Sequence, residues 1–328
     1  MAAATIGGMQ VETRAQRRRA FPWLEVLAGV VYAVGLLAYT AEYGAPLKTR
    51  KIFVAIMIGL LVPTIRTPRR WLRGVARDWL PLLVVLFSYD VLRGRADDVN
   101  TVVHYEPQLE IDKLLGGGKP LSAVLQDQLW QGTPSWYDHI VSTVYLSHFC
   151  VTLVVLAVLW VARHDVFRRF RNVVLTVVLA SFATYFIYPA APPWLAAYTD
   201  RAPDIVRTVG LTLHAKALAA SPVLPGHGPA LANPVAALPS LHGALPLLLA
   251  LFFWKRVRPA LRVVLALYPL AMAFVLIYGG EHYAFDIALG WLYVGVAFLV
   301  WTRIWRRADQ RAQEDDELVP EELGQPVG

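Results

Sequence analysis

The sequence has little charge and almost no cysteine. Only 17% of its 328 residues are charged, whereas 56% are hydrophobic, a composition too apolar for an ordinary soluble domain of this size. The single cysteine, Cys150, lies inside an apolar run, so an intramolecular disulfide and a thiolate metal cluster are both excluded. We therefore expect an integral membrane protein and no redox chemistry.

The basic residues do not form the kind of surface that binds a nucleic acid. The formal net charge is +7, but Lys and Arg flank apolar runs instead of interleaving with polar helices. We interpret them as anchors at the membrane surface, and we expect the bilayer, not a nucleic acid, as a partner. The basic stretch Arg14–Arg19 precedes a long apolar run without a small-residue cleavage site, which predicts a retained first span.

Apolar runs of bilayer length predict an all-α fold, a polytopic membrane bundle of about eight transmembrane helices. Three of these runs are shorter than the roughly 20 residues of a straight span, so interfacial residues such as Trp79 are expected to lengthen them. Most other tryptophans, including Trp194, are also interpreted as interface residues. The predicted helices cover residues 22–42, 51–66, 79–93, 139–162, 170–189, 241–255, 259–278 and 283–305.

The distribution of Lys and Arg predicts the orientation of these helices. With both termini in the cytoplasm, most of the 31 Lys and Arg residues fall on the cytoplasmic side, where basic residues are retained during insertion. We therefore predict a multi-pass protein of the cell membrane with both termini inside. The basic cytoplasmic segments are residues 14–19, 66–77, 163–171, 255–262 and 303–311.

The two long connections, residues 94–138 and 190–240, then lie outside, so function is expected at the outer face. Prolines forbid a continuous helix through much of the second connection, which is predicted to be an ordered cap or a mobile lid. An amphipathic piece of the first, Leu121–Trp130, is predicted to lie in the membrane interface. The chain divides into a basic cytoplasmic N-terminus (1–21), peripheral transmembrane helices (22–74), a transmembrane catalytic domain (75–307) and a disordered acidic cytoplasmic tail (308–328).

Two short motifs in the last third of the chain carry residue types suited to phosphoryl chemistry. In Pro239-Ser240-Leu241-His242, Ser240 stands just before a predicted helix, where it can cap the helix and where free backbone N–H groups bind anions. In the second motif, His282 and Asp286 are four residues apart, so a helix would place both side chains on one face. The carboxylate can then accept from one imidazole nitrogen and leave the other free to attack.

The predicted helices bring both histidines to the same side of the membrane. The helix after His242 carries the chain inward, and the next helix returns it outward to His282. Each crossing covers about 30 Å, so two crossings restore the starting level. Either histidine alone would more often be a hydrogen-bonded interfacial residue, but two motifs in order on one face favour a catalytic site.

These residues resemble the membrane phosphatidic acid phosphatase (PAP2) superfamily, which shares its helical core with vanadium haloperoxidases. The stretch Pro239–His242 resembles the Ser-x-His motif of that family, and His282 with Asp286 resembles its His-x-x-x-Asp motif. The longer form Glu281-His282-Tyr283-x-x-Asp286, with Tyr188–Trp194 before it, is similar to the inositolphosphotransferase branch, which includes inositol phosphorylceramide synthases. The resemblance covers roughly residues 75 to 305, and the two motifs are specific only in combination.

The resemblance implies a role for each motif residue. His282 would attack phosphorus and form a phosphohistidine, Asp286 would orient and stabilise its ring, and His242 would protonate the leaving alkoxide. Ser240 and neighbouring backbone N–H groups would hold the phosphoryl oxygens. The residues assigned to the substrate and its phosphate also include Gly243, Glu281 and Tyr283, and neither a cofactor nor a metal is expected.

One element of the family pattern is missing. The usual first motif, a Lys followed after six residues by Arg-Pro, does not occur in an outer loop. The preferred candidate for the phosphate-binding cation is Arg93, at the outer end of the third predicted helix, with Lys216 and Arg201 in the long loop as alternatives. The inositolphosphotransferase-like branch also lacks the standard form of this motif.

The resulting hypothesis is a membrane enzyme that acts on a lipid phosphate or phospholipid at the outer leaflet. Water as the acceptor makes the reaction a hydrolysis, whereas a polyol or lipid alcohol makes it a transfer, which the branch resemblance favours slightly. The alternative is a non-catalytic lipid transporter or lipid-binding scaffold on the same helical core. A further histidine, His148, lies in an aliphatic helix, where packing or an interhelix hydrogen bond is favoured over chemistry.

Overall fold

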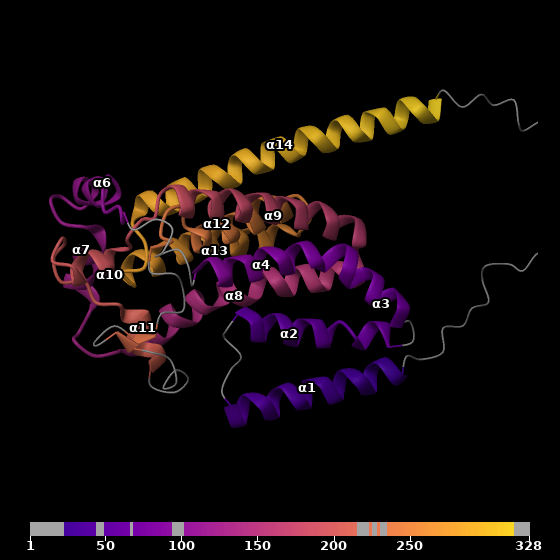
Figure 1. The fold of residues 1–328 in the computed structure, drawn as a ribbon, viewed down its shortest axis with the longest axis horizontal. Coiled ribbons are helices and arrows are strands. Elements are labelled where there is room, and N and C mark those ends of the chain that lie inside the picture. The colour runs from indigo at the N-terminus through magenta and orange to yellow at the C-terminus, as the bar shows by residue number, and fades with distance from the viewer. Residues whose placement is uncertain are drawn as a thin grey trace, which may run out of the picture.

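The computed structural model describes residues 23–43, 49–65, 68–93, 102–214, 223–224, 228–229 and 235–317. These residues are mostly helical, which confirms the predicted all-α class (Figure 1). Two strands of two residues each, β1 (Val223–Leu224) and β2 (Gly228–Pro229), pair antiparallel. The helices are α1 (Trp23–Tyr43), α2 (Thr49–Gly59), η1 (Val62–Thr64), α3 (Pro68–Gly74), η2 (Val75–Trp79), α4 (Leu80–Arg93), α6 (Gln108–Leu115), α7 (Leu121–Leu129), α8 (Trp136–Ala162), α9 (His164–Ile187), α10 (Pro193–Tyr198), α11 (Thr208–His214), α12 (Leu241–Phe253), α13 (Pro259–Tyr278) and α14 (Ala284–Glu317).

Four of these helices are long and apolar enough to cross a membrane, which makes the chain an integral membrane protein. They are α8, α9, α13 and the Ala284–Arg311 part of α14. Two further apolar helices are shorter, namely α12 and the Leu24–Thr40 part of α1. The total of eight spans, and the side of the membrane on which each loop lies, stay predictions.

Several helix boundaries differ from those expected. The helix predicted for residues 51–66 ends at Gly59 and is followed by the short turn η1, because Pro63 has no N–H for a continuing α-helix. The helix predicted to begin at residue 170 begins at His164, directly after the turn at Arg163.

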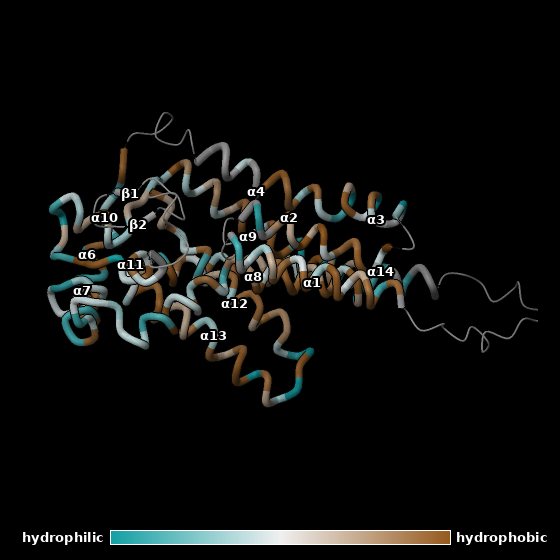
Figure 2. The backbone as a smooth tube through the Cα atoms, turned by 90° about the horizontal axis from the view of Figure 1, so that it is seen from below, coloured by the Kyte–Doolittle hydropathy of each residue, from teal (hydrophilic) through white to brown (hydrophobic). Residues whose placement is uncertain are grey.

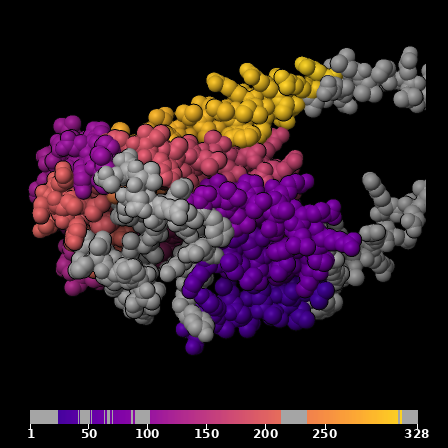
Figure 3. All heavy atoms as spheres, in the orientation of Figure 1, coloured from indigo at the N-terminus to yellow at the C-terminus, as the bar shows by residue number. Residues whose placement is uncertain are grey.

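The prediction of a disordered tail from residue 308 is wrong as far as Glu317. Helix α14 continues through residues 308–317, a segment rich in good helix formers such as Ala, Gln, Arg and Glu. An ion pair between Arg169 of α9 and Asp309, 3.0 Å apart, ties this part of α14 to the bundle. Figure 3 shows α14 as the yellow helix whose far end extends past its neighbours.

Helix α12 forms the centre of the bundle. Its residues from Gly243 to Leu249 are mostly buried, and it contacts α8, α9, α13 and α14. A helix that is apolar all round belongs in such a core. Trp79 packs into the same cluster against Phe53 and Phe167. It is fully buried, so its predicted interfacial position is wrong.

The described parts of the two long connections form an ordered cap at one end of the bundle. Helices α6, α7, α10 and α11 lie together there, opposite the end that carries α3 (Figure 1). Colouring by hydropathy shows more hydrophilic residues in the cap than along the long helices (Figure 2). The two connections are joined where His104 N donates to Pro189 O and Ala191 N donates to His104 O.

Helix α7 belongs to this cap, and its predicted position in the membrane interface stays a prediction. Its buried residues are Ser122, Ala123 and Gln126. The Gln126 side chain donates to the carbonyl oxygens of Val206 and Tyr278, at 2.8 Å and 2.7 Å. Its small and polar face therefore contacts protein, because buried polar groups require hydrogen-bond partners.

Helix α14 packs closely against the start of α12 at Gly290. A Cβ atom added at Gly290 would lie 2.5 Å from the carbonyl oxygen of Ser240, closer than any real side chain can approach. The absence of a side chain at Gly290 thus permits close contact between the segments that carry the two histidine motifs.

Replacing Gly290 with alanine should therefore destabilise the protein. The added methyl group forces α14 away from the Ser240 backbone, and overpacking of this kind costs about 1–3 kcal/mol. The measurement is thermal or denaturant unfolding of the purified protein in detergent.

Gly295→Ala on the same helix is the matched control. A Cβ at Gly295 meets no described atom within 4 Å, and Gly to Ala inside a helix stabilises by about 0.5–1 kcal/mol. Equal stability changes in the two variants would contradict the close contact at Gly290.

Candidate active site

Ser240 joins the two histidine motifs at the start of α12. It is the N-cap of α12, and its side-chain oxygen accepts from Gly243 N at 3.1 Å. Its own N–H donates to the backbone carbonyl of Asp286 at 2.9 Å. Trp291 of α14 donates from Nε1 to Gly243 O at 3.0 Å. The start of α12 and the first turns of α14 are therefore bonded to each other directly.

His282 lies between Asp286 and His242. Its Nδ1 is 3.5 Å from Asp286 Oδ2, and its Nε2 is 3.4 Å from His242 Nδ1. Contrary to the expectation of one shared helical face, His282 lies in the turn just before α14, which begins at Ala284. Asp286 Oδ2 also accepts from Tyr283 N at 3.0 Å. The carboxylate thus fixes the turn from which the imidazole projects.

Several buried polar atoms at this site have no hydrogen-bond partner within the described part of the chain. They include His242 Nε2, Asp286 Oδ1 and the Tyr283 hydroxyl. A buried polar atom without a partner is costly and rare, so a cluster of them indicates a place for a ligand. Burial, together with the nearby carboxylates of Asp286 and Asp112, raises the pKa of the Tyr283 phenol. Its hydroxyl therefore stays protonated and can donate to an anion.

Aromatic residues of α8 surround His242. The Tyr145 ring stacks on the His242 ring with centroids 5.0 Å apart and an interplanar angle of 16°. The rings of His148 and Phe149 lie 4.1 Å and 5.5 Å from it. His148 therefore packs directly against His242, a position that was not predicted from the sequence. Helical spacing could have indicated that His148 lies beside Tyr145 and Phe149, because residues at i, i+3 and i+4 share one face of a helix.

The structure also reveals a buried ion pair that the sequence did not suggest. Arg207 Nε and Nη2 bond Glu281 Oε1 and Oε2 at 2.7 Å and 3.0 Å, a bidentate arrangement. The guanidinium lies over the Trp194 ring, 5.0 Å from its centroid, so Trp194 is buried beside the site and not at the membrane interface.

Arg207 is fully charged in this position. Burial disfavours its charge, but the Glu281 carboxylate outweighs that effect and raises the pKa of the guanidinium. Tyr145, whose ring stacks on His242, also helps to stabilise the charge of Arg207 and raise its pKa. A permanent positive charge therefore lies close to the histidine pair, with Tyr145 between Arg207 and His242. Glu281 is the ion-pair partner of this charge.

Of the predicted cations, only Arg201 has a described side chain, and it is not at the site. Lys216 lies outside the described residues, and Arg93 is the last residue of α4 with a side chain that is also outside them. Arg201 is exposed, with its guanidinium 4.4 Å from the centroid of the Tyr105 ring. No predicted cation therefore corresponds to Arg207, which lies in a loop without a motif signature.

Buried residues of the cap hold the His282 turn in place. Asp112 of α6 accepts from Ala284 N at 3.0 Å and from Leu121 N at 2.8 Å; burial raises the pKa of its carboxyl group. Gly280 has φ of 69°, and a Cβ there would lie 2.9 Å from Ile205. The turn therefore requires glycine and is clamped by residues far away in the sequence.

Comparison with known proteins identifies a family. A family model described as "PAP2 superfamily" matches residues 118–300, which include every residue of the site named above except Asp112. No curated protein and no solved structure matches the chain. Within the described residues, no group of three or more His, Cys, Asp or Glu side chains is arranged to hold a metal ion.

The buried ion pair yields a stability prediction. Glu281→Ala should destabilise the protein by about 3–5 kcal/mol, because it leaves Arg207 charged and buried without its partner. Unfolding of the purified protein in detergent measures the change.

The double variant Arg207→Met/Glu281→Leu is the control for this loss. Apolar residues of similar volume remove both charges together, so most of the stability should return. If the double variant is as unstable as Glu281→Ala alone, packing and not the unpaired charge explains the loss.

Proposed function

The chain belongs to the PAP2 superfamily, whose members act on lipid phosphates in membranes as phosphatases or phosphotransferases, and we propose that it transfers phosphoryl groups through a phosphohistidine on His282. The observation that carries this proposal is the position of His282 between two partners. Its Nδ1 is 3.5 Å from Asp286 Oδ2, and its Nε2 is 3.4 Å from His242 Nδ1. An imidazole held by a carboxylate on one nitrogen, and facing a second imidazole on the other, is arranged for nucleophilic catalysis.

In the first step, His282 Nε2 attacks the phosphorus of a lipid phosphoester. The N–P bond forms as the P–O bond to the lipid alcohol breaks, and that oxygen leaves with the bonding electrons. His242 donates a proton to the leaving oxygen; its Nδ1 lies 3.4 Å from the attacking nitrogen, within reach of a group on the same phosphorus. Asp286 stabilises the positive charge that develops on the His282 ring.

The phosphoryl oxygens need positive partners during this step. The N-terminus of α12, capped by Ser240, directs its backbone N–H groups and helix dipole toward the site. We assign the cationic role to Arg207 in place of Arg93 or Lys216, because Arg207 is buried and charged and interacts electrostatically with Tyr145, which stacks on His242. The protonated Tyr283 hydroxyl supplies a further donor.

In the second step, an acceptor attacks the phosphohistidine, and His242 removes the proton from it. Water as the acceptor gives hydrolysis and free phosphate. A polyol or lipid alcohol gives transfer, which we favour because the motif Glu281–Asp286 is similar to the inositolphosphotransferase branch. The ordered cap over the site supports the same choice, since it can exclude water from the intermediate.

We place the reaction at the outer leaflet. Basic segments predicted to be cytoplasmic meet at the end of the bundle away from the cap, where Arg171 and His164 pair with Asp78 and Arg169 pairs with Asp309. The site lies at the cap end. Retention of the basic end in the cytoplasm would put the cap and the site outside.

A test of the mechanism is the turnover and labelling of the purified protein with phosphatidic acid carrying a radioactive phosphate. His282→Ala should abolish both turnover and the labelled phosphoenzyme. His242→Ala should slow turnover by about 10² to 10⁴-fold, the usual contribution of a general acid, and should accumulate the label.

His139→Ala is the matched control for these variants, because His139 is an exposed histidine near the start of α8, the helix that also carries His148. It should keep wild-type turnover. Full activity in His282→Ala would sink the phosphohistidine mechanism. Lipid binding or movement without any turnover in the wild-type protein would favour the non-catalytic transporter or scaffold.

The acceptor can be tested separately. With a lipid phosphoester labelled in its phosphate and added inositol, a transferase should form labelled inositol phosphate in preference to free phosphate. A product that is inorganic phosphate alone, at all inositol concentrations, would make the enzyme a phosphatase and contradict the preference for transfer.

A further inference from the structure

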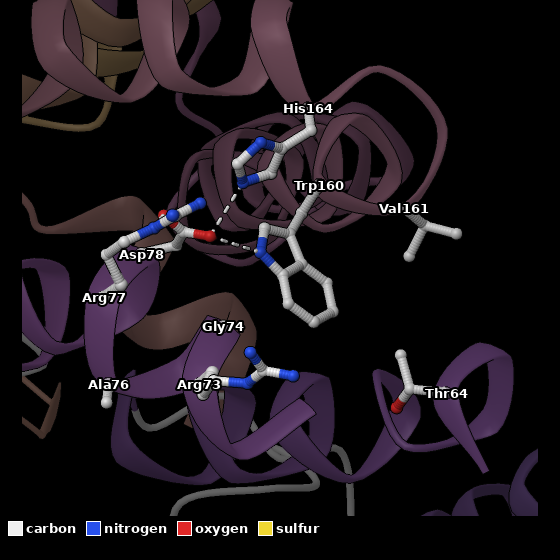
Figure 4. Close-up of a pocket in the computed structure, with 9 residues that line it drawn as sticks. All are labelled: Thr64, Arg73, Gly74, Ala76, Arg77, Asp78, Trp160, Val161 and His164. Atoms are coloured by element: carbon white, nitrogen blue, oxygen red, sulfur yellow. Dashed lines mark hydrogen bonds and ion pairs between the residues drawn. The ribbon is translucent and has the colours of Figure 1, made fainter. Parts of the chain in front are cut away.

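A groove of about 840 Å³ lies at the end of the bundle opposite the cap. It opens between the segment α3–η2 and the junction of α8 with α9 (Figure 4). On α8, Trp160 in this groove is 12 residues from His148 at the active site, which corresponds to roughly 18 Å along a helix. The groove is lined by Thr64, Arg73, Gly74, Ala76, Arg77, Asp78, Trp160, Val161 and His164.

The carboxylate of Asp78, which is only 2% exposed, holds together the side chains that form the wall of the groove. Trp160 Nε1 donates to Asp78 Oδ2 at 3.1 Å, and His164 Nε2 lies 2.7 Å from the same oxygen. Arg77 and Arg171 approach Oδ1 at 3.2 Å and 3.5 Å. Burial disfavours the charge of Asp78, but the hydrogen bonds from His164, Trp160 and Arg77 outweigh it and lower the pKa of the carboxyl group. The carboxylate therefore has its own partners.

Arg73 and the exposed part of Arg77, whose Nε pairs with Asp78, lie on the open side of the groove. Arg73 and Arg77 are one helical turn apart, and the Arg77 side chain is 71% exposed. Figure 4 shows the Arg73 side chain extending into the groove. Arg73 Nε donates to the carbonyl oxygen of Arg69, and within the described chain no carboxylate lies within 4.0 Å of Arg73. With Asp78 also paired to Arg171, the groove presents a net positive surface.

Apolar residues flank these arginines as they would at the headgroup level of a bilayer. Leu72 and Leu80 are 61% and 50% exposed, and Val161 in the groove wall is 46% exposed. Arg side chains that rise from such an apolar surface place their charge among lipid headgroups. Basic pockets between membrane helices at the cytoplasmic face are typical sites for anionic lipid headgroups.

We propose that this groove binds the phosphate of an anionic phospholipid. Arg73 and Arg77 contact the phosphate, and the acyl chains follow the exposed apolar surface at Leu72 and Val161. Trp160 forms the rigid floor, since its ring packs so closely on Gly74 that a Cβ there would lie 2.2 Å from it. The site is separate from the catalytic residues and does not depend on the reaction proposed for them.

The test counts the lipids that remain on the full-length protein. The protein is purified from bilayers of phosphatidylcholine with phosphatidylglycerol, washed in detergent, and analysed by mass spectrometry for phosphatidylglycerol bound per protein molecule. In Arg73→Ala/Arg77→Ala, retention should fall roughly tenfold or more, because each arginine near an anionic lipid contributes several-fold to binding. Arg306→Ala/Arg307→Ala, which removes two exposed arginines of α14, should retain lipid as the wild type does.

A second pair of variants tests the shape of the site without changing its charge. Val161→Trp fills the groove and should reduce retention to a similar extent. Val158→Trp, one turn earlier on α8 and outside the groove lining, should not. Turnover at the catalytic site is measured in all variants and should stay at the wild-type level.

Three results would overturn the proposal. They are unchanged retention in Arg73→Ala/Arg77→Ala, equal loss in Arg306→Ala/Arg307→Ala, and wild-type retention in Val161→Trp. A competition experiment distinguishes the phosphate of a phospholipid headgroup from free inorganic phosphate. Displacement of the bound lipid by millimolar inorganic phosphate would assign the site to a free anion and contradict a phospholipid headgroup.

Discussion

The backbone hydrogen bond from Ser240 to the carbonyl of Asp286 is the contact on which the site depends. It joins the start of α12 to the first turn of α14, and thereby sets the distance between His242 and His282. Ser240 also caps α12, so the same residue aims the positive end of the helix dipole at the space beside both histidines. The missing side chain at Gly290 allows the two backbones to meet. Without this join, the two motifs would be carried by helices free to separate.

Burial of charge is the second constraint, and the protein meets it differently at its two ends. At the candidate active site, Arg207 and Glu281 satisfy each other in a bidentate pair, while neutral atoms such as Tyr283 Oη have no partner among the described residues. At the opposite end, a single carboxylate, Asp78, collects several donors and leaves arginines beyond it exposed. One end therefore holds its cation inside the protein, whereas the other presents cations to the membrane surface.

The sequence predicted what local patterns determine. Apolar runs located the long helices, and the order of the two histidine motifs along adjacent helices placed His242 and His282 at one end of the bundle, where the structure brings them together. Residues fixed by tertiary contacts could not be predicted in this way. Arg207 lies in a loop with no motif, and its importance arises from its contacts with Trp194 and with Glu281, which is 74 residues later in the sequence. Trp79 has the composition of an interfacial residue, but the packing of Phe53 and Phe167 around it buries it. The helix beyond residue 308 is supported by a contact with Arg169 that no tail composition reveals.

The hydrogen bonds that hold the cap have a consequence for the order in which the protein is made. The hydrogen bond from Gln126 can form only after Tyr278, 152 residues later, has been synthesised. The bond that Asp112 accepts from Ala284 requires a residue 172 positions later. A ribosome delivers chain at about 5–20 residues per second, so these polar groups stay without their final partners for many seconds while intervening helices enter the bilayer. These contacts of the cap form only after α13 and the start of α14 have been synthesised. A nascent chain that has not yet reached Ala284 therefore cannot form the contacts that hold the candidate site together.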